Sequence, residues 1–146
     1  MIIVEKRLIP PEILKDSVLV HLAAAYYSIG KQLEQKTQCS QTRGFIMSTL
    51  RGGVALNQNQ IATLLGFDRT VVHRAIRTLI QEGLASEKRA DSGRALLVRL
   101  TAKGNQYRER LIKERRAADE KLRKVLKPAE IAMLVRLLKV VAEVKM

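Results

Sequence analysis

Apolar residues recur along this chain every three or four positions, which is the spacing of an amphipathic helix. The first such pattern follows Pro10 and Pro11, a natural helix start because proline is tolerated in the first helical turn, and runs to about Thr37. Its apolar positions are Ile13, Leu14, Val18, Leu22, Tyr26, Ile29 and Leu33. We therefore expect one long first helix, interrupted in pattern only by Gly30.

The centre of the chain predicts three shorter helices with tight connections. Residues 41–50 form the first, which a Gly-Gly pair ends. Asn57 can cap the second, which holds Ile61, Leu64 and Leu65 and which Gly66 closes. Asp68 can cap the third, which Gly83 ends. The third helix should bury one stripe of side chains: Val72, Ile76, Leu79 and Ile80.

The pattern then changes period. Residues 84–88 and 95–100 predict two short strands, and Asp91-Ser92-Gly93 supplies the turn between them. Thr101 can cap a long helix that Lys127-Pro128 breaks, and a final helix follows. The predicted fold class is mainly α with a small β-hairpin wing: a winged helix-turn-helix with long helices at both ends.

The net charge indicates what kind of partner this protein binds. The 146 residues carry a formal charge of +13, and the pI is about 10.4, so we expect a polyanionic partner such as nucleic acid. Residues 69–103 hold eight lysines and arginines against three acids. The single cysteine excludes an internal disulfide and suits a reducing cytoplasm, and no stretch is long and apolar enough for a membrane span.

The basic side chains fall where a winged helix would meet DNA. The predicted contacts of the third central helix with the major groove are Arg69, Thr70, His73, Arg74 and Arg77. The helix before it opens with residues suited to phosphate contact, Asn57, Gln58 and Asn59. The predicted contacts of the hairpin are Lys88, Arg89, Ser92 and Arg94. Arg94 is suited to the minor groove, and Asp91 is placed to orient it.

Each of these assignments has a plainer alternative. The arginine row is alternatively a solvated helix face, and His73 is either a DNA contact or a surface residue. Cys39 has little in its sequence neighbourhood to activate a thiol, so we expect it to be inert. The two histidines and one cysteine are too scattered for a metal motif. No phosphate loop, nucleophile elbow or catalytic acid pair is recognisable, so we expect neither an enzyme nor a cofactor.

The segment NQNQIATLLGFDRTVVHRAIRTLIQEGLASEKRADSGRALLVRLTAKG resembles the MarR (multiple-antibiotic-resistance regulator) family of winged helix-turn-helix repressors. The order of flanking helices also fits. The resemblance implies a dimerisation helix in residues 1–40, a DNA-binding lobe in 41–104 and dimerisation helices in 105–146, all intertwined in a homodimer. Such a two-fold dimer would bind a pseudo-palindromic operator. The chain departs from the family where it has Val71 and His73 and in its shorter wing.

The resemblance also implies a cleft for a small aromatic or phenolic effector, between the dimerisation helices and the DNA-binding lobe. The candidate lining residues are His21, Tyr26, Arg43 and Phe45. Arg43 can hold a carboxylate in two bonds, and the rings can stack on an aromatic body. The alternatives are a surface or phosphate-binding role for Arg43, a core role for the aromatic rings and a dimer-interface position for His21.

Two main function classes follow. The first is a sequence-specific dimeric transcription regulator, expected to be a repressor. The second is a non-specific architectural nucleic-acid-binding protein, which the high charge also permits. A regulator should prefer its operator over random DNA by ~10³-fold or more, which separates the two classes. A third option is a protein-interaction module that has kept the fold without DNA binding.

Overall fold

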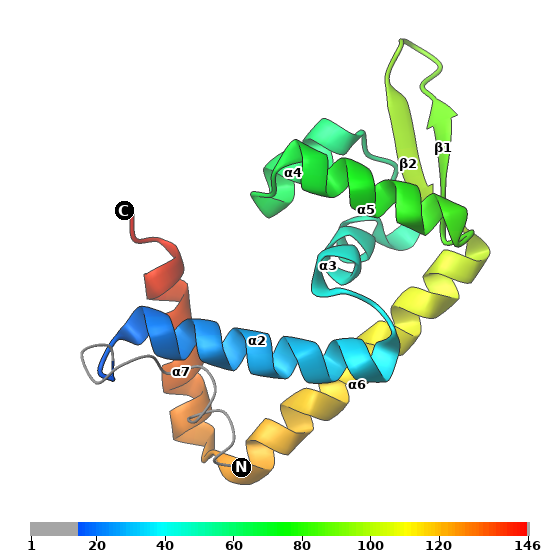
Figure 1. Cartoon of the computed structure of the whole chain (residues 1–146). Helices are drawn as coiled ribbons and strands as arrows, with labels where there is room; N and C mark the ends of the chain where they lie inside the picture. Colours follow the sequence, from blue (N-terminus) through cyan, green and yellow to red (C-terminus); the bar gives the residue numbers. More distant parts are fainter. Residues whose placement is uncertain (1–14, 146) are drawn as a thin grey trace. The chain divides into compact units, whose positions relative to one another are not determined.

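The computed structural model describes residues 15–145 and is mostly helical, with one two-stranded hairpin (Figure 1). The elements follow in chain order: α2 (Val18–Thr37), α3 (Gln41–Thr49), the 3₁₀ turn η2 (Arg51–Gly53), α4 (Gln58–Leu65), α5 (Arg69–Gln81), β1 (Ala85–Arg89), β2 (Leu96–Leu100), α6 (Ala102–Val125) and α7 (Pro128–Ala142). This order confirms the predicted fold class, and the element boundaries agree within a few residues everywhere except at the first helix.

The first helix is shorter than predicted. The expected start at Pro10 and Pro11 lies outside the described residues, but α2 itself begins only at Val18. Ser17 has an extended backbone, and its hydroxyl accepts a hydrogen bond from the Val20 N–H at 3.4 Å. A serine in this conformation is an N-cap, so a helix cannot run through it without interruption. The prediction missed this because the apolar spacing continues across the cap.

The core lies among α3, α4, α5 and the hairpin. Its fully buried large side chains are Ile46, Met47 and Leu50 from α3, Ile61 from α4, Val72, Ile76 and Leu79 from α5, and Val98 from β2. The predicted stripe on α5 is therefore confirmed, with Ile80 partly buried against the core. Leu64 of α4 is 66% exposed and lies outside this core.

Local sequence signals set the turns of this lobe. Asn57 and Gln60 form a reciprocal capping box at the start of α4. Gly66 ends that helix at φ 65°, a left-handed conformation that glycine adopts without steric cost. β1 pairs antiparallel with β2, as predicted. A third short segment, not predicted from the sequence, also joins this sheet: Leu56 and Val98 exchange backbone hydrogen bonds of 3.1 and 2.8 Å.

The chain divides into two compact units, one ending at Leu111 and one beginning at Ile112, so the boundary falls within α6. In the first unit, the Tyr107 hydroxyl donates a 2.7 Å hydrogen bond to the Thr37 carbonyl, which ties α6 to the end of α2. In the second unit, α7 contains no buried residue. Among the described residues, no helix is long and apolar enough to cross a membrane.

The packing of α6 on the hairpin yields a stability prediction. Gly104 is buried in the first turn of α6, and a Cβ there would overlap the Leu84 carbonyl group. Gly→Ala in a helix ordinarily stabilises a protein by about 0.4–1 kcal/mol. We expect Gly104→Ala instead to lower the free energy of unfolding by about 1–3 kcal/mol, as overpacking does, measured by urea denaturation.

Gly93→Ala is the matched control, because a Cβ at Gly93 meets nothing within 4 Å. It should leave the unfolding midpoint nearly unchanged. A Gly104→Ala protein as stable as the wild type would show that α6 and Leu84 are not in close contact.

Candidate nucleic-acid interface

Helix α5 has two opposite faces. Its buried residues are Val72, Ala75, Ile76 and Leu79. The exposed residues Thr70, His73, Arg74 and Arg77 stand at positions i, i+3, i+4 and i+7, so they share the opposite face. The predicted arrangement, with one face packed and the other open, is confirmed. Arg69 is also exposed but lies in the first turn, beside this face.

Asp68 fixes where this helix begins. Its carboxylate accepts a 2.7 Å hydrogen bond from the Thr70 N–H. Hydrogen bonds from Thr70 stabilise the ionised form and hold the pKa of Asp68 below its usual value. The charged cap also faces the positive end of the helix dipole. The cap therefore sets the first turn of α5, in which Arg69 and Thr70 lie.

The start of α4 differs from the prediction in one respect. Two of the backbone N–H groups at this end already donate hydrogen bonds within the protein. The Asn57 N–H donates to the Gln60 side chain and the Gln60 N–H donates to the Asn57 side chain, both at 2.9 Å. The capping box leaves the N–H groups of Gln58 and Asn59 as the ones available to a phosphate. The Asn59 side chain is exposed. The predicted phosphate contact at this end thus narrows to Gln58 and Asn59.

Gln58 also connects three elements. Its amide nitrogen donates to a Glu87 carboxylate oxygen on β1 at 3.1 Å. Its amide oxygen lies 3.1 Å from Nδ1 of His73 on α5. These bonds link α4, α5 and the hairpin on the exposed side of the lobe. Gln58 and His73 are predicted from the sequence only as separate DNA contacts, and the bond to Glu87 is not predicted.

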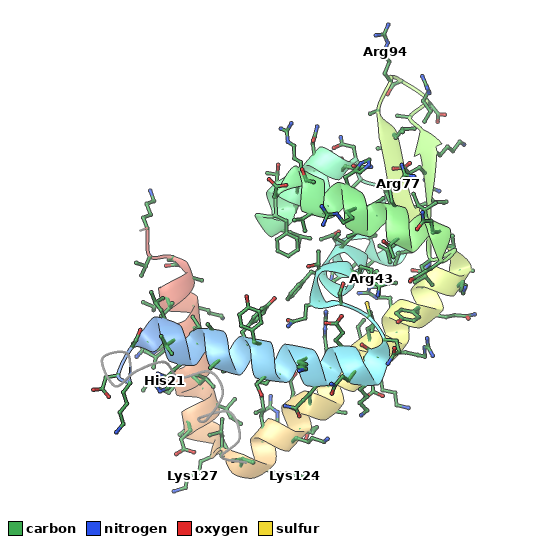
Figure 2. The ribbon with its side chains drawn as sticks, in the orientation of Figure 1. His21, Arg43, Arg77, Arg94, Lys124 and Lys127 are labelled. Carbon is green, nitrogen blue, oxygen red and sulfur yellow. The ribbon has the colours of Figure 1, made fainter. Side chains whose placement is uncertain are left out.

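The basic residues of the hairpin lie near its tip or at the tip itself. Figure 2 shows Arg94 projecting from the end of the wing, away from the helices. The other predicted contacts, Lys88, Arg89 and Ser92, are also exposed. The expected orienting role of Asp91 is not observed: both residues are described, and no ion pair joins Asp91 to Arg94. The turn is instead held by the backbone bond from Ala90 N–H to the Ala95 carbonyl at 2.9 Å.

Acids in this region face partners within the protein. All eight cations of residues 69–103 are exposed. Glu87 accepts from Gln58, and Glu82, at the end of α5, accepts two 2.8 Å hydrogen bonds from one guanidinium nitrogen of Arg43. Their charges are thus partly satisfied internally, and the exposed face of α5 and the wing present mainly positive charge.

The four candidate effector residues do not come together within one chain. His21 and Tyr26 lie in the first half of α2, and Arg43 and Phe45 lie in α3. The helix from His21 to Thr37 alone spans roughly 24 Å. His21 is exposed, with Nδ1 2.8 Å from the Ser17 carbonyl oxygen. Phe45 packs edge-on against Phe67 at 6.2 Å. The structure of one chain does not bring these four residues together, and the effector site made of all four stays a prediction.

Arg43 lines two clefts. One, of about 520 Å³, lies between it and the last two turns of α2, with Lys31, Glu34, Gln35 and Gln38. The other, of about 240 Å³, lies between α3 and α5 and also contains Arg74 and Thr78. The guanidinium is already engaged, because it also donates to the Gln38 carbonyl at 3.2 Å.

Two other sequence expectations concern reactive groups. Cys39 is 5% exposed and packs in the core cluster, where a thiol is screened from solvent reagents. Within residues 15–145, no three histidine, cysteine or acidic side chains cluster as a metal site would require.

Solved structures of other proteins share this fold. The repressor CouR bound to a 23-mer DNA duplex matches with TM-score 0.82 at 21% identity, over 92% of this chain and 99% of that chain. A mutant of MarR from E. coli complexed with operator DNA matches with TM-score 0.77 at 18% identity, over 90% and 99%. PcaV from Streptomyces coelicolor with its natural ligand matches with TM-score 0.77 at 22% identity, over 89% and 94%.

Neither the protein-family models nor the curated proteins include a match to this sequence. At these identities, the structural likeness establishes the fold: this chain has the winged helix-turn-helix architecture of the MarR-type regulators.

Proposed function

We propose that this chain is a MarR-type, sequence-specific, dimeric DNA-binding transcription regulator that acts in the cytoplasm as a repressor. The observation that carries the proposal is the open face of α5. Thr70, His73, Arg74 and Arg77 line one exposed side of a helix whose opposite side is buried. A helix held in this way can enter the major groove, where arginine recognises guanine through O6 and N7.

The surrounding elements support the same docking. The start of α4 offers the N–H groups of Gln58 and Asn59 to a phosphate, which would fix the register of the protein on the duplex. The projecting wing offers Arg94 to the adjacent minor groove, whose negative potential attracts arginine. The DNA held by CouR and by E. coli MarR, which share this fold, supports the proposal.

Selection of bound sequences from a random duplex library separates a regulator from an architectural binder. A regulator should enrich one motif with two related half-sites and bind it ~10³-fold or more tightly than random DNA at the same salt concentration. Recovery of a library with no enriched motif, despite tight binding, would favour the architectural alternative.

The role of Arg74 gives a quantitative prediction on that motif. If Arg74 makes a bidentate base contact, Arg74→Ala should cost about 1–3 kcal/mol on the enriched site and much less on random DNA. Fluorescence anisotropy titrations on both duplexes measure the difference. Arg99→Ala, which removes an exposed arginine from β2, is the control for charge alone. Equal losses for Arg74→Ala on both duplexes would assign Arg74 to a phosphate.

We propose that the chain forms a dimer, because two of its helices have many solvent-exposed apolar side chains. On α7, the exposed apolar residues are Met133, Leu134, Val135, Leu137, Leu138 and Val140. On α2, they are Val18, Leu19, Leu22, Tyr26, Tyr27 and Ile29. Exposed apolar surface of this extent marks an interaction face, and a second copy is the partner that a palindromic operator also needs. The predicted dimerisation regions, 1–40 and 105–146, contain these two helices.

Substitution on α7 tests the dimer. Leu134→Glu with Leu138→Glu should weaken it strongly, since burying one leucine contributes about 1.5–3 kcal/mol and each dimer contains two copies of both. Lys139→Glu introduces the same charge at an exposed polar position of α7 and should leave the dimer intact. Sedimentation velocity over a concentration series measures both. A wild-type chain that sediments as a monomer throughout would exclude the dimer.

Arg43 is proposed as the anchor of an anionic aromatic effector, supported by its place in both clefts. A carboxylate bound to Arg43 would compete with Glu82 and loosen the end of α5 from α3. Only a ligand that prefers the DNA-incompetent dimer can act in this way. PcaV, which shares this fold, was solved in complex with its natural ligand, and this supports the proposal that the fold can bind an effector.

A panel of aromatic acids and phenols, titrated into the protein–operator complex, tests this role. An effector should lower operator affinity by roughly 5–150-fold. Arg43→Ala should abolish the response. Glu82→Gln, which weakens the internal competitor and keeps Arg43, should make the protein respond at lower ligand concentration. An identical response in Arg43→Ala would exclude Arg43 as the anchor.

A further inference from the structure

The hydrogen-bond chain Glu87–Gln58–His73 restricts the imidazole to one tautomer. A carboxylate only accepts hydrogen bonds, so the Gln58 side chain must face Glu87 with its NH₂ group, as the 3.1 Å bond from Nε2 to Oε1 requires. Its carbonyl oxygen then faces His73 Nδ1 at 3.1 Å. A carbonyl oxygen is also only an acceptor. Nδ1 of His73 must therefore carry the proton.

The other ring nitrogen is the one available to a ligand. In a neutral imidazole with the proton on Nδ1, Nε2 has a lone pair and accepts a hydrogen bond. No other described residue hydrogen-bonds to Nε2 of His73. His73 shares the exposed face of α5 with Thr70, Arg74 and Arg77, which is the face that the proposed function places in the major groove.

We propose that His73 is a base-reading residue that presents an acceptor to DNA, and that Gln58 and Glu87 position it to do so. In the major groove, an acceptor selects an exocyclic amino group, on cytosine N4 or adenine N6, and is mismatched against guanine O6 and N7, which are themselves acceptors. His73 thus complements Arg74, a donor one residue further along the helix. Gln58 and Glu87 act as positioning residues through His73.

This inference rests on the proposed function but has a readout that needs no DNA. The chain contains only two histidines, so His21→Gln leaves His73 as the single imidazole. Imidazole ¹⁵N NMR at pH 8, where histidine side chains in general are mostly neutral, distinguishes the two tautomers. We expect protonated Nδ1 and unprotonated Nε2 in the His21→Gln protein. A predominant Nε2–H tautomer would overturn the proposal whatever the protein binds.

Glu87→Gln is the decisive variant because it is nearly isosteric. A glutamine at position 87 can donate as well as accept, so the Gln58 amide is free to turn over and donate to Nδ1. His73 can then carry its proton on Nε2 and accommodate guanine. We expect the ¹⁵N spectrum of Glu87→Gln in the His21→Gln background to show a mixture of tautomers. An unchanged spectrum would overturn the positioning role of Glu87.

Base preference completes the test. Library selection with His73→Ala identifies the base pair that depends on His73. Replacing the cytosine or adenine of that pair with an analogue that lacks the exocyclic amino group should weaken binding by the wild type and leave binding by His73→Ala unchanged. We expect the wild type to favour this base over guanine by roughly 3–10-fold, the range for one hydrogen bond. Glu87→Gln should reduce the ratio toward unity. Asp91→Asn removes the same charge from the hairpin and should leave the ratio unchanged while raising affinity for all sequences.

The outcomes separate the two proposals. If the wild type enriches no motif, the proposed regulator function fails while the tautomer measurement still stands. If a motif is enriched but no position depends on His73, or if removing the exocyclic amino group at the dependent position does not weaken binding by the wild type, base reading by a His73 acceptor is overturned. A Glu87→Gln protein with the wild-type base ratio would overturn the positioning role.

Discussion

The burial of one face of α5 is the constraint on which the rest of this structure depends. Val72, Ile76 and Leu79 are fully buried, and their removal from water contributes about 1.5–3 kcal/mol each. A helix committed to the core in this way cannot rotate. Its opposite face must stay open, and that face carries cations that would be costly to bury without partners. Core packing thus presents Thr70, His73, Arg74 and Arg77 together.

The two ends of α5 are held separately. At the N-terminus, the Asp68 carboxylate caps the helix through the Thr70 N–H. At the C-terminus, Arg43 binds Glu82, and the Lys103 ammonium donates to the Glu82 carbonyl at 2.8 Å. The exposed face of α5 is therefore presented by a helix tied to α3 and α6 as well as packed on the core. Such preorganisation would lower the ordering cost of the proposed DNA binding.

Helices α2 and α7 differ from α5 in that most of their large apolar side chains are exposed in the single chain. Joining two copies would bury these faces and would also pair two recognition helices, as a palindromic site demands. The same apolar stripes would then serve both stability and half-site spacing.

What the sequence determined by itself was local. The capping signals at Asn57 and Asp68, the left-handed turn at Gly66 and the two-faced pattern of α5 depend on residues within a turn or two, so they could be predicted correctly. The cation row could be placed on the exposed face of α5 for the same reason. Where a local signal was overlooked, as at Ser17, the predicted first helix was too long.

Tertiary structure decided the partners that are distant in the chain. Arg43 meets Glu82 across 39 residues, Gln58 meets Glu87 across 29, and His73 meets Gln58 across 15. It also joined Leu56 to β2. Helical and strand periodicity identify which face of an element is apolar, but they do not encode which element packs against it. Those pairings arise only when the core closes.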